Sequence, residues 1–92
     1  MTKADLVNEI SSSTGYDRRT VAVIVENLTD EIKKSLANGE NVYLRGFGSF
    51  VLKTRKAKIA RNITQKTSMY VPEHNIPYFK PAADFREGIR KK

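Results

Sequence analysis

The sequence contains no cysteine and no long apolar run, and both absences narrow the class of protein. Without cysteine, neither disulfide bonds nor a thiolate metal site can reinforce the fold. No stretch approaches the ~20 apolar residues that a membrane-spanning helix needs. Lys3 is followed by Asp5 and Glu9 instead of an apolar segment, so we expect no signal peptide. The sequence therefore predicts a soluble, cytoplasmic protein with no membrane partner.

Residues that carry out catalysis are also scarce. His74 is the only histidine, and a single histidine between Glu73 and Asn75 is more typical of a solvated side chain than of a base or a ligand. The sequence shows no metal-ligand cluster, no nucleophile motif and no glycine-rich phosphate loop. These absences predict a protein that is not an enzyme, needs no cofactor or metal and has no small-molecule substrate.

Positive charge is in excess, and it is unevenly distributed. The 92 residues carry a net charge of +7. Residues 1–40 hold five bases and seven acids, a net charge of −2, whereas residues 41–92 hold twelve bases and three acids, a net charge of +9. This asymmetry predicts one half that folds and a second half that contacts a polyanion.

Two amphipathic helices are predicted in the first 40 residues. Thr2 and Asp5 have the spacing of a capping box, and the helix that they begin should end near residue 13 in a run of Ser, Thr and Gly. Asp17 is a suitable N-cap for the second helix, whose apolar residues recur every three or four positions until Asn38-Gly39. Its stripe of about five turns is too long for one short helix to cover. Because a chain of this size has only a thin core, we expect it to associate with a second copy.

Strands are predicted in the second half. Residues 42–45 and 49–53 form a strand on each side of Gly46 and Gly48, a turn where a side chain would clash or positive φ is required. Polar residues 62–66 predict the next turn and residues 67–71 the returning strand. Pro72 and Pro77 should interrupt this strand and confine the ribbon to edge-like pairing. Residues 76–79 then return to the core, and Pro81 suits the opening of a last helix. Phenylalanines are expected in the core and the dimer interface: Phe47, Phe50 and Phe79.

A basic segment that contains no acidic residue extends from Lys53 to Lys66. Charge on both sides of an extended chain prevents this segment from packing on a core. A solvated tail is the plainer interpretation, but the bases alternate with small or β-prone residues and glycine is missing, unlike a flexible linker. We interpret the segment as a ribbon that becomes ordered on nucleic acid, because Lys and Arg neutralise phosphates and release counterions. Its six bases are Lys53, Arg55, Lys56, Lys58, Arg61 and Lys66.

Three motifs resemble the bacterial HU and integration host factor family of DNA-bending proteins. They are Gly-Phe-Gly-Ser-Phe at residues 46–50, the arm residues Arg55, Lys58, Arg61 and Asn62, and Ile-Pro-Tyr-Phe-Lys-Pro at residues 76–81. The resemblance covers nearly the whole chain without gaps. It implies an α+β fold: an intertwined homo- or heterodimer with a helical base, a three-stranded antiparallel sheet per chain and a protruding basic β-ribbon arm. Residues 1–92 would be one domain, with a helical dimerisation part (1–40), the sheet and arm (41–81, tip near 61–66) and a C-terminal helix (82–92).

The resemblance also implies that the arm lies in the minor groove of double-stranded DNA and that an apolar residue at its tip enters a base step. The family usually has Asn-Pro and then a glycine at the tip, whereas this chain has Asn62, Ile63 and Lys66. Ile63 either acts as the wedge or packs on the sugar edge, and Met69 is a competing apolar contact. The residues expected to contact DNA are Lys3, Lys53, Arg55, Lys56, Lys58, Arg61, Asn62, Ile63, Thr64, Lys66, Lys80 and Arg86.

We therefore predict a nucleoid-associated architectural protein that bends, wraps and compacts duplex DNA with low sequence preference. Such a protein should prefer bent, nicked or junction DNA to intact linear DNA. Three alternatives stay open: sequence-specific bending like that of integration host factor, RNA binding as a chaperone, and a protein scaffold whose basic arm docks on acidic partners.

Overall fold

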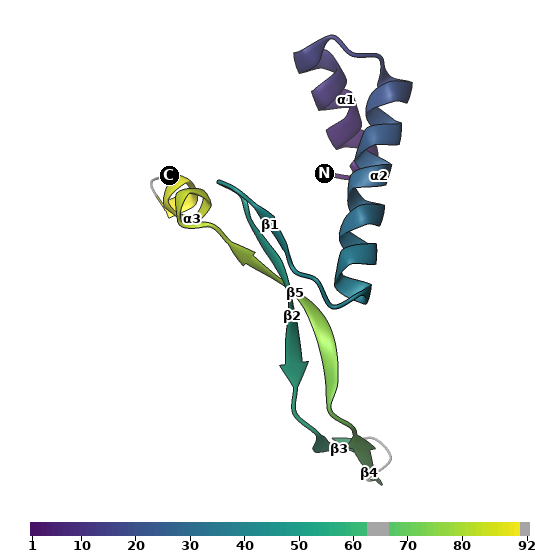
Figure 1. Cartoon of the computed structure of the whole chain (residues 1–92), viewed down its shortest axis with the longest axis vertical. Coiled ribbons are helices and arrows are strands. Elements are labelled where there is room, and N and C mark those ends of the chain that lie inside the picture. The colour runs from purple at the N-terminus through teal and green to yellow at the C-terminus, as the bar shows by residue number, and fades with distance from the viewer. Residues whose placement is uncertain (63–66, 91–92) are drawn as a thin grey trace. The chain divides into compact units, whose positions relative to one another are not determined.

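The computed structural model describes residues 1–62 and 67–90, and for residues 60–62 and 67 it describes the backbone alone. The elements group into two compact units, Met1–Ser35 and Leu36–Lys92 (Figure 1). The single-domain organisation stays a prediction. In chain order, the elements are α1 (Lys3–Thr14), α2 (Arg18–Ala37), β1 (Val42–Leu44), β2 (Gly48–Arg55), β3 (Lys58–Asn62), β4 (Thr67–Val71), β5 (His74–Pro81) and α3 (Ala83–Arg90).

Helix α1 is capped at both ends by the residues that the sequence predicts. The Thr2 hydroxyl accepts a hydrogen bond from the Asp5 backbone N–H at 3.2 Å, and the Asp5 carboxylate accepts one from the Thr2 N–H at 2.9 Å. At the other end Gly15 adopts the left-handed conformation (φ 82°), and its N–H donates to the Ser11 carbonyl at 2.9 Å. The capping box is confirmed.

Helix α2 begins at the predicted cap, Asp17. Its carboxylate accepts hydrogen bonds from the backbone N–H of Arg19 at 2.9 Å and from that of Thr20 at 3.3 Å. The hydroxyl of Thr20 and these N–H groups hold the pKa of the Asp17 carboxyl below its ordinary value. Gly39, at φ 83°, closes the helix through a 3.0 Å hydrogen bond to the Leu36 carbonyl. None of the described helices combines the length and the apolar character that crossing a membrane requires.

The two helices bury very little between them. Val7 and Val21 are the only buried apolar side chains among the described residues, at 7% and 4% exposure. On the apolar stripe of α2, by contrast, Ile24 is 62% exposed and Leu28 is 49% exposed. A stripe of this length therefore stays uncovered in the single chain, as the sequence predicts.

The second unit contains two antiparallel sheets. β1, β2 and β5 form a three-stranded sheet in the order β1-β2-β5, and β3 and β4 form a two-stranded ribbon. Gly48 pairs with Pro81 at the end of the sheet next to α3, and Arg55 pairs with His74 at the other end. The β3–β4 ribbon continues the chain from that second end (Figure 1). The predicted sheet and ribbon are both confirmed.

The two glycines between β1 and β2 are needed for different reasons. Gly46 has a φ of 81°, which disfavours a residue with a Cβ. At Gly48, a Cβ would lie 2.6 Å from the Phe79 ring and 2.7 Å from the Lys80 carbonyl oxygen. The turn therefore combines a positive φ with a close approach of β5, as the motif predicts.

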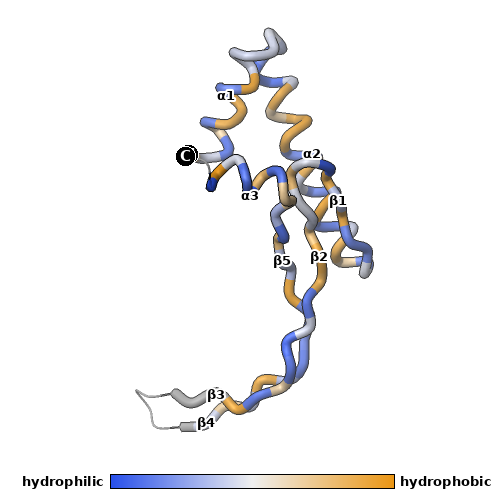
Figure 2. Tube along the Cα trace, turned by 90° about the vertical axis from the view of Figure 1, so that its left-hand side faces the viewer, coloured by the Kyte–Doolittle hydropathy of each residue, from blue (hydrophilic) through white to orange (hydrophobic). Residues whose placement is uncertain are grey.

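The second unit contains a small aromatic cluster. Phe79 has ring centroids 5.0 Å from those of Phe47 and Phe50, and Phe47 stacks on Phe85 at 5.4 Å. Phe47 nevertheless stays 45% exposed. Much of β2 is apolar, α3 mixes apolar and hydrophilic residues, and the end of the β2–β5 pair nearest β3 and β4 is hydrophilic (Figure 2). The rings pack on one another, but none of the three is buried in the single chain, so their roles in a core and in a dimer interface stay predictions.

One prediction about proline was wrong. Pro77 does not interrupt a strand, because it lies inside β5 opposite Leu52. β5 is an edge strand of its sheet, where a residue without an N–H is tolerated. Pro72 does interrupt the pairing, since it lies with Glu73 between β4 and β5. Pro81 is the last residue of β5, and α3 begins at Ala83.

Candidate nucleic-acid interface

One face of the β2–β5 pair carries exposed basic side chains. Ser49 pairs with Lys80, Lys53 with Ile76, and Arg55 with His74. Side chains alternate between the faces of a strand, and directly opposite residues share a face. Lys53, Arg55 and Lys80 therefore lie on one face of the sheet, and all three are exposed. We call this the basic face.

The opposite face of the same strands is apolar. It carries Phe50 opposite Phe79 and Leu52 opposite Pro77. The 5.0 Å contact between the rings of Phe50 and Phe79 shows that these two side chains do share a face. The sheet therefore separates a face that packs on its own unit from a face that presents positive charge to solvent.

Tyr78 belongs to the basic face and is 43% exposed, so the prediction that residues 76–79 return to the core is wrong for this residue. Its ring lies under the Lys53 ammonium, with 4.4 Å between Nζ and the ring centroid. A cation over an aromatic face is attracted to the ring quadrupole, so Tyr78 orients Lys53. The signal was present in the sequence, because Tyr78 stands two residues from Lys80 in a strand and shares its face.

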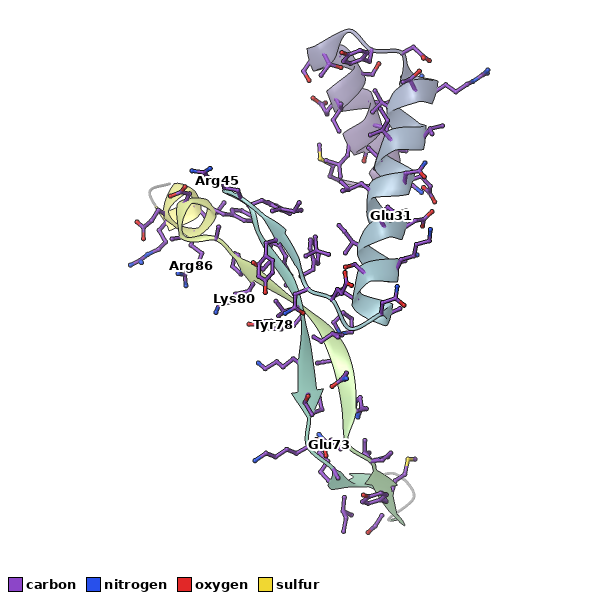
Figure 3. The ribbon with its side chains drawn as sticks, viewed as in Figure 1. Glu31, Arg45, Glu73, Tyr78, Lys80 and Arg86 are labelled. Carbon is purple, nitrogen blue, oxygen red and sulfur yellow. The ribbon has the colours of Figure 1, made fainter. Side chains whose placement is uncertain are left out.

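Two arginines extend the positive charge towards α3. The Phe47 carbonyl accepts a 2.9 Å hydrogen bond from the Ala82 N–H, which places the turn containing Arg45 beside the start of that helix. Arg45 and Arg86 are both exposed (Figure 3). Arg86 was predicted from the sequence and Arg45 was missed, because a residue just before a glycine turn gives no sign of the direction of its side chain.

At the far end of the basic face, basic residues surround a shallow hollow. His74 lies there, with its Nδ1 atom 2.9 Å from the Pro72 carbonyl oxygen. Within the described residues no group of three or more His, Asp or Glu side chains is placed to hold a metal ion. The hollow instead concentrates positive charge at the base of the arm. Its lining residues are Arg55, Lys56, Ala57, Lys58, His74 and Ile76.

The structure describes both strands of the arm, β3 and β4, but not residues 63–66 between them. Lys58 is exposed and pairs with Val71 at the start of β3. The backbones of Arg61 and Asn62 pair with those of Ser68 and Thr67. The remaining predicted tip contacts lie outside the described residues: Ile63, Thr64 and Lys66.

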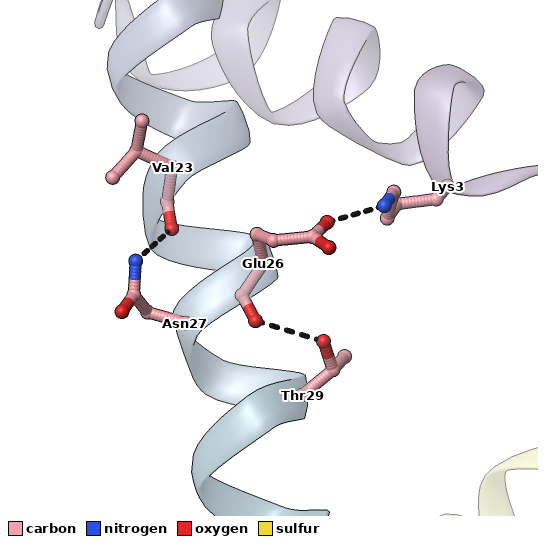
Figure 4. A network of polar contacts seen from close by, with 5 residues as sticks. All are labelled: Lys3, Val23, Glu26, Asn27 and Thr29. Carbon is pink, nitrogen blue, oxygen red and sulfur yellow. Dashed lines mark hydrogen bonds and ion pairs between the residues drawn. The ribbon is translucent and has the colours of Figure 1, made fainter.

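Lys3 is the one predicted contact that belongs to the first unit. Its ammonium donates to the Glu26 carboxylate of α2 (Figure 4). That hydrogen bond, with the attraction between the two charges, holds the pKa of the Glu26 carboxyl below its ordinary value. The Lys3 side chain is still 58% exposed, so a phosphate can approach it.

This arrangement agrees with that of known proteins. The sequence model of a family described as bacterial DNA-binding protein matches residues 1–90. The chain is 34% identical over 91 residues to DNA-binding protein HU of Thermus thermophilus, which covers 99% of this chain and 94% of that protein. It is 36% identical over 90 residues to integration host factor subunit beta of Marinobacter nauticus, covering 97% and 92% respectively. The chain in an Anabaena HU–DNA cocrystal structure superposes with a TM-score of 0.93 at 27% identity, over 100% of both chains.

The fold and the basic face define a DNA-binding protein of the α+β class. The chain belongs to the bacterial DNA-binding protein family that includes HU and the integration host factor subunits.

Proposed function

We propose that two copies of this chain form a dimer that holds duplex DNA against its basic faces, places its arms in the minor groove and bends the DNA with low sequence preference. The observation that carries this proposal is the separation of the β2–β5 pair into two faces. Lys53, Arg55 and Lys80 are exposed on one face, while Phe50 and Phe79 pack together on the other. The phosphates of a DNA duplex would neutralise the cations on this face.

The contacts expected from this geometry are mainly electrostatic. Each Lys or Arg that neutralises a phosphate releases counterions, which makes affinity fall as salt rises. Contacts of this kind fix the position of the protein and carry little sequence information. The residues proposed to contact DNA are those of the basic face and hollow (Lys53, Arg55, Lys56, Lys58, Lys80), Arg86 and Arg45 beside α3, Lys3, and the arm residues Arg61, Asn62, Ile63, Thr64 and Lys66.

Dimerisation follows from the apolar surface that the chain leaves uncovered. Besides Ile24 and Leu28, exposed apolar side chains include Leu6 at 46% and Ile89 at 62%. A 92-residue chain with two buried apolar side chains among its described residues has too little core to be stable alone. A second copy covers these stripes, and it also supplies a second arm.

Bending explains which DNA should be preferred. Smooth bending of a short site costs on the order of 1–6 kcal/mol. The extra contacts of a wrapped duplex offset that cost. A nick, a gap or a junction lowers the bending cost, so such DNA should bind more tightly than intact linear DNA of the same length.

The test is a salt-titrated binding series on intact, nicked and four-way-junction DNA. We expect tighter binding to the two flexible substrates at every salt concentration. Replacing Lys53 and Arg55 by Ala should reduce the salt slope by about one unit per lost phosphate contact. The matched control is Lys34→Ala in α2, which pairs with Glu31 at 3.4 Å and should leave the slope unchanged. Equal affinity for intact and nicked DNA would contradict bending.

Site-specific bending is the alternative that the relatives raise, since they include both HU and integration host factor subunits. A footprint confined to one defined site would favour it, and uniform protection would favour the low-specificity function. In either case we propose a non-catalytic protein of the bacterial nucleoid, in the cytoplasm.

A further inference from the structure

His74 is a side chain of the basic face that the proposed function leaves unused. It stands opposite Arg55 in the last pair of the three-stranded sheet, and it is exposed. Its Nδ1 atom lies 2.9 Å from the Pro72 carbonyl oxygen. A carbonyl oxygen can only accept, so Nδ1 carries the proton of this hydrogen bond. The bond therefore leaves Nε2 as the ring nitrogen that is available to another partner.

Nε2 can donate a hydrogen bond in only one charge state of the ring. While a neutral ring keeps its proton on Nδ1, Nε2 is an acceptor, whereas both nitrogens of a protonated ring are donors. Within the described part of the chain, no other residue forms a hydrogen bond with this ring. Histidine is the side chain whose charge ordinarily changes between pH 5 and 8. A fall in pH across this range thus turns Nε2 from an acceptor into a donor.

The charged groups around the ring are mostly basic. Arg55, Lys56 and Lys58 line the same hollow as His74, and all three are exposed. Glu73, the residue before His74, is the nearest acid in the chain and is exposed as well. The ion pairs of the described residues involve none of these four charged side chains. Three cations without an acidic partner suit a ligand that brings negative charge and several acceptor oxygens, as a phosphate does.

We propose that the hollow holds one phosphate of the DNA backbone and that protonated His74 donates a hydrogen bond to it from Nε2. The inference rests on the proposed binding of duplex DNA to the basic face. A neutral ring offers the phosphate only an acceptor, which cannot bond to its oxygens. Binding therefore takes up a proton in each hollow that a phosphate fills, and affinity rises as pH falls.

The test measures the affinity of the wild type for an intact DNA duplex at pH 8 and at pH 6, over a series of salt concentrations. A hydrogen bond between charged groups predicts roughly tenfold tighter binding at pH 6 for each filled hollow. The salt slope should also rise by about one unit per filled hollow, because one more cation meets a phosphate. The phosphodiesters of DNA keep their charge over this range, so the change belongs to the protein.

Two substitutions at position 74 fix the charge of the side chain. His74→Gln is neutral at both pH values, so its affinity and its salt slope should hardly change between them. His74→Lys is cationic at both, so its salt slope should equal that of the wild type at pH 6 throughout. His74 is the only histidine in the chain, and both variants keep every other titrating group.

Glu73→Gln tests the other partner that a protonated ring could choose. If the ring paired with the Glu73 carboxylate instead of a phosphate, this variant would lose the dependence on pH. In the proposed arrangement it should bind DNA more tightly than the wild type at both pH values, because an acid beside the phosphate is removed. The ratio of its affinities at pH 6 and pH 8 should match the wild-type ratio.

Three outcomes would overturn the assignment. They are equal affinities of the wild type at pH 8 and pH 6, a dependence on pH that persists in His74→Gln, and one that disappears in Glu73→Gln. The bending proposal is judged separately, by the preference of the wild type for nicked over intact DNA at a single pH, so each idea can fail while the other stands.

Discussion

At the scale of single residues, the chain places its special residues where the backbone or a neighbour demands them. Thr2 and Asp17 begin helices through side-chain hydrogen bonds, and Gly15 and Gly39 end them at positive φ. These roles depend on local geometry and could be predicted from the sequence. Tyr78 was assigned to the core because residues beside it are apolar, although its spacing from Lys80 placed it on the same face; its contact with Lys53 depends on the pairing of another strand.

The close approach at Gly48 leads to a prediction about stability. In Gly48→Ala the new methyl group would meet the Phe79 ring and the Lys80 carbonyl oxygen, at 2.6 and 2.7 Å. Moving the backbone of β5 away from this methyl group is energetically unfavourable, so the free energy of unfolding should fall by roughly 1–3 kcal/mol. Urea denaturation measures it. Gly88 in α3 is the matched control, since a Cβ there meets nothing within 4 Å, and Gly88→Ala should raise stability slightly. Equal effects of the two substitutions would refute this role of Gly48.

The contact between Lys3 and Glu26 predicts a weak pH dependence. The Glu26 carboxyl has a lowered pKa in the folded chain, chiefly because of the hydrogen bond from Lys3. Its contribution to stability is therefore present above the ordinary carboxyl pKa of 4.5 and is lost as pH falls through the lowered value. The thermal midpoint of the wild type should exceed that of Glu26→Gln at neutral pH, and the difference should vanish in acid. Because both groups are exposed, the difference should also shrink at high salt. A difference that grows in acid would have the wrong sign.

At the scale of elements, periodicity predicted most of the fold. The helices and the first two strands lie where the pattern of apolar residues and glycines places them, and the three-stranded sheet and the ribbon arm lie as the family resemblance implies. The prolines correctly predicted an edge strand, but Pro77 lies inside β5 and does not interrupt it, because an edge strand tolerates a residue without an N–H. That position is set by pairing between segments that are far apart in the sequence. Arg45 was not selected because a residue just before a glycine turn gives no sign of the direction of its side chain. The hydrogen bond between Phe47 and Ala82 brings its turn beside α3.

The tip of the arm leads to a prediction about bending. If Ile63 enters a base step, Ile63→Ala should reduce the bend angle more than the affinity, because the phosphate contacts of the arm stay in place. Energy transfer between dyes at the two ends of a duplex reports the angle, and a gel titration reports the affinity. Ser68→Ala is a suitable control, because Ser68 is an exposed residue of the arm that is not among the proposed DNA contacts. An unchanged angle in Ile63→Ala would assign Ile63 to the sugar edge instead.

At the scale of the whole molecule, the main feature is an apolar surface on the helices that no part of the single chain covers. Two buried apolar side chains among the described residues contrast with exposed ones on all three helices. This surface supports the proposal that two copies act together, because a dimer would cover it and would provide a second arm.

The dimer predicts that charge on the α2 stripe abolishes assembly. Ile24 is 62% exposed, and Ile24→Asp would place a carboxylate in the proposed interface, where an unpaired buried charge is strongly unfavourable. Sedimentation should show a monomer, with loss of helix content and of DNA binding. Thr29→Asp introduces the same charge at a polar, exposed position of the same helix and should stay dimeric. A dimeric Ile24→Asp protein would move the interface elsewhere.

The most direct test of the central claim is the end-to-end distance of a short dye-labelled duplex, measured by energy transfer while the wild-type protein is titrated at several salt concentrations. A protein that grips and bends DNA through its basic faces should shorten this distance at saturation, and the concentration needed should rise steeply with salt. Two results would contradict the account: a saturated complex in which the duplex is unbent, or a half-saturating protein concentration that does not change with salt.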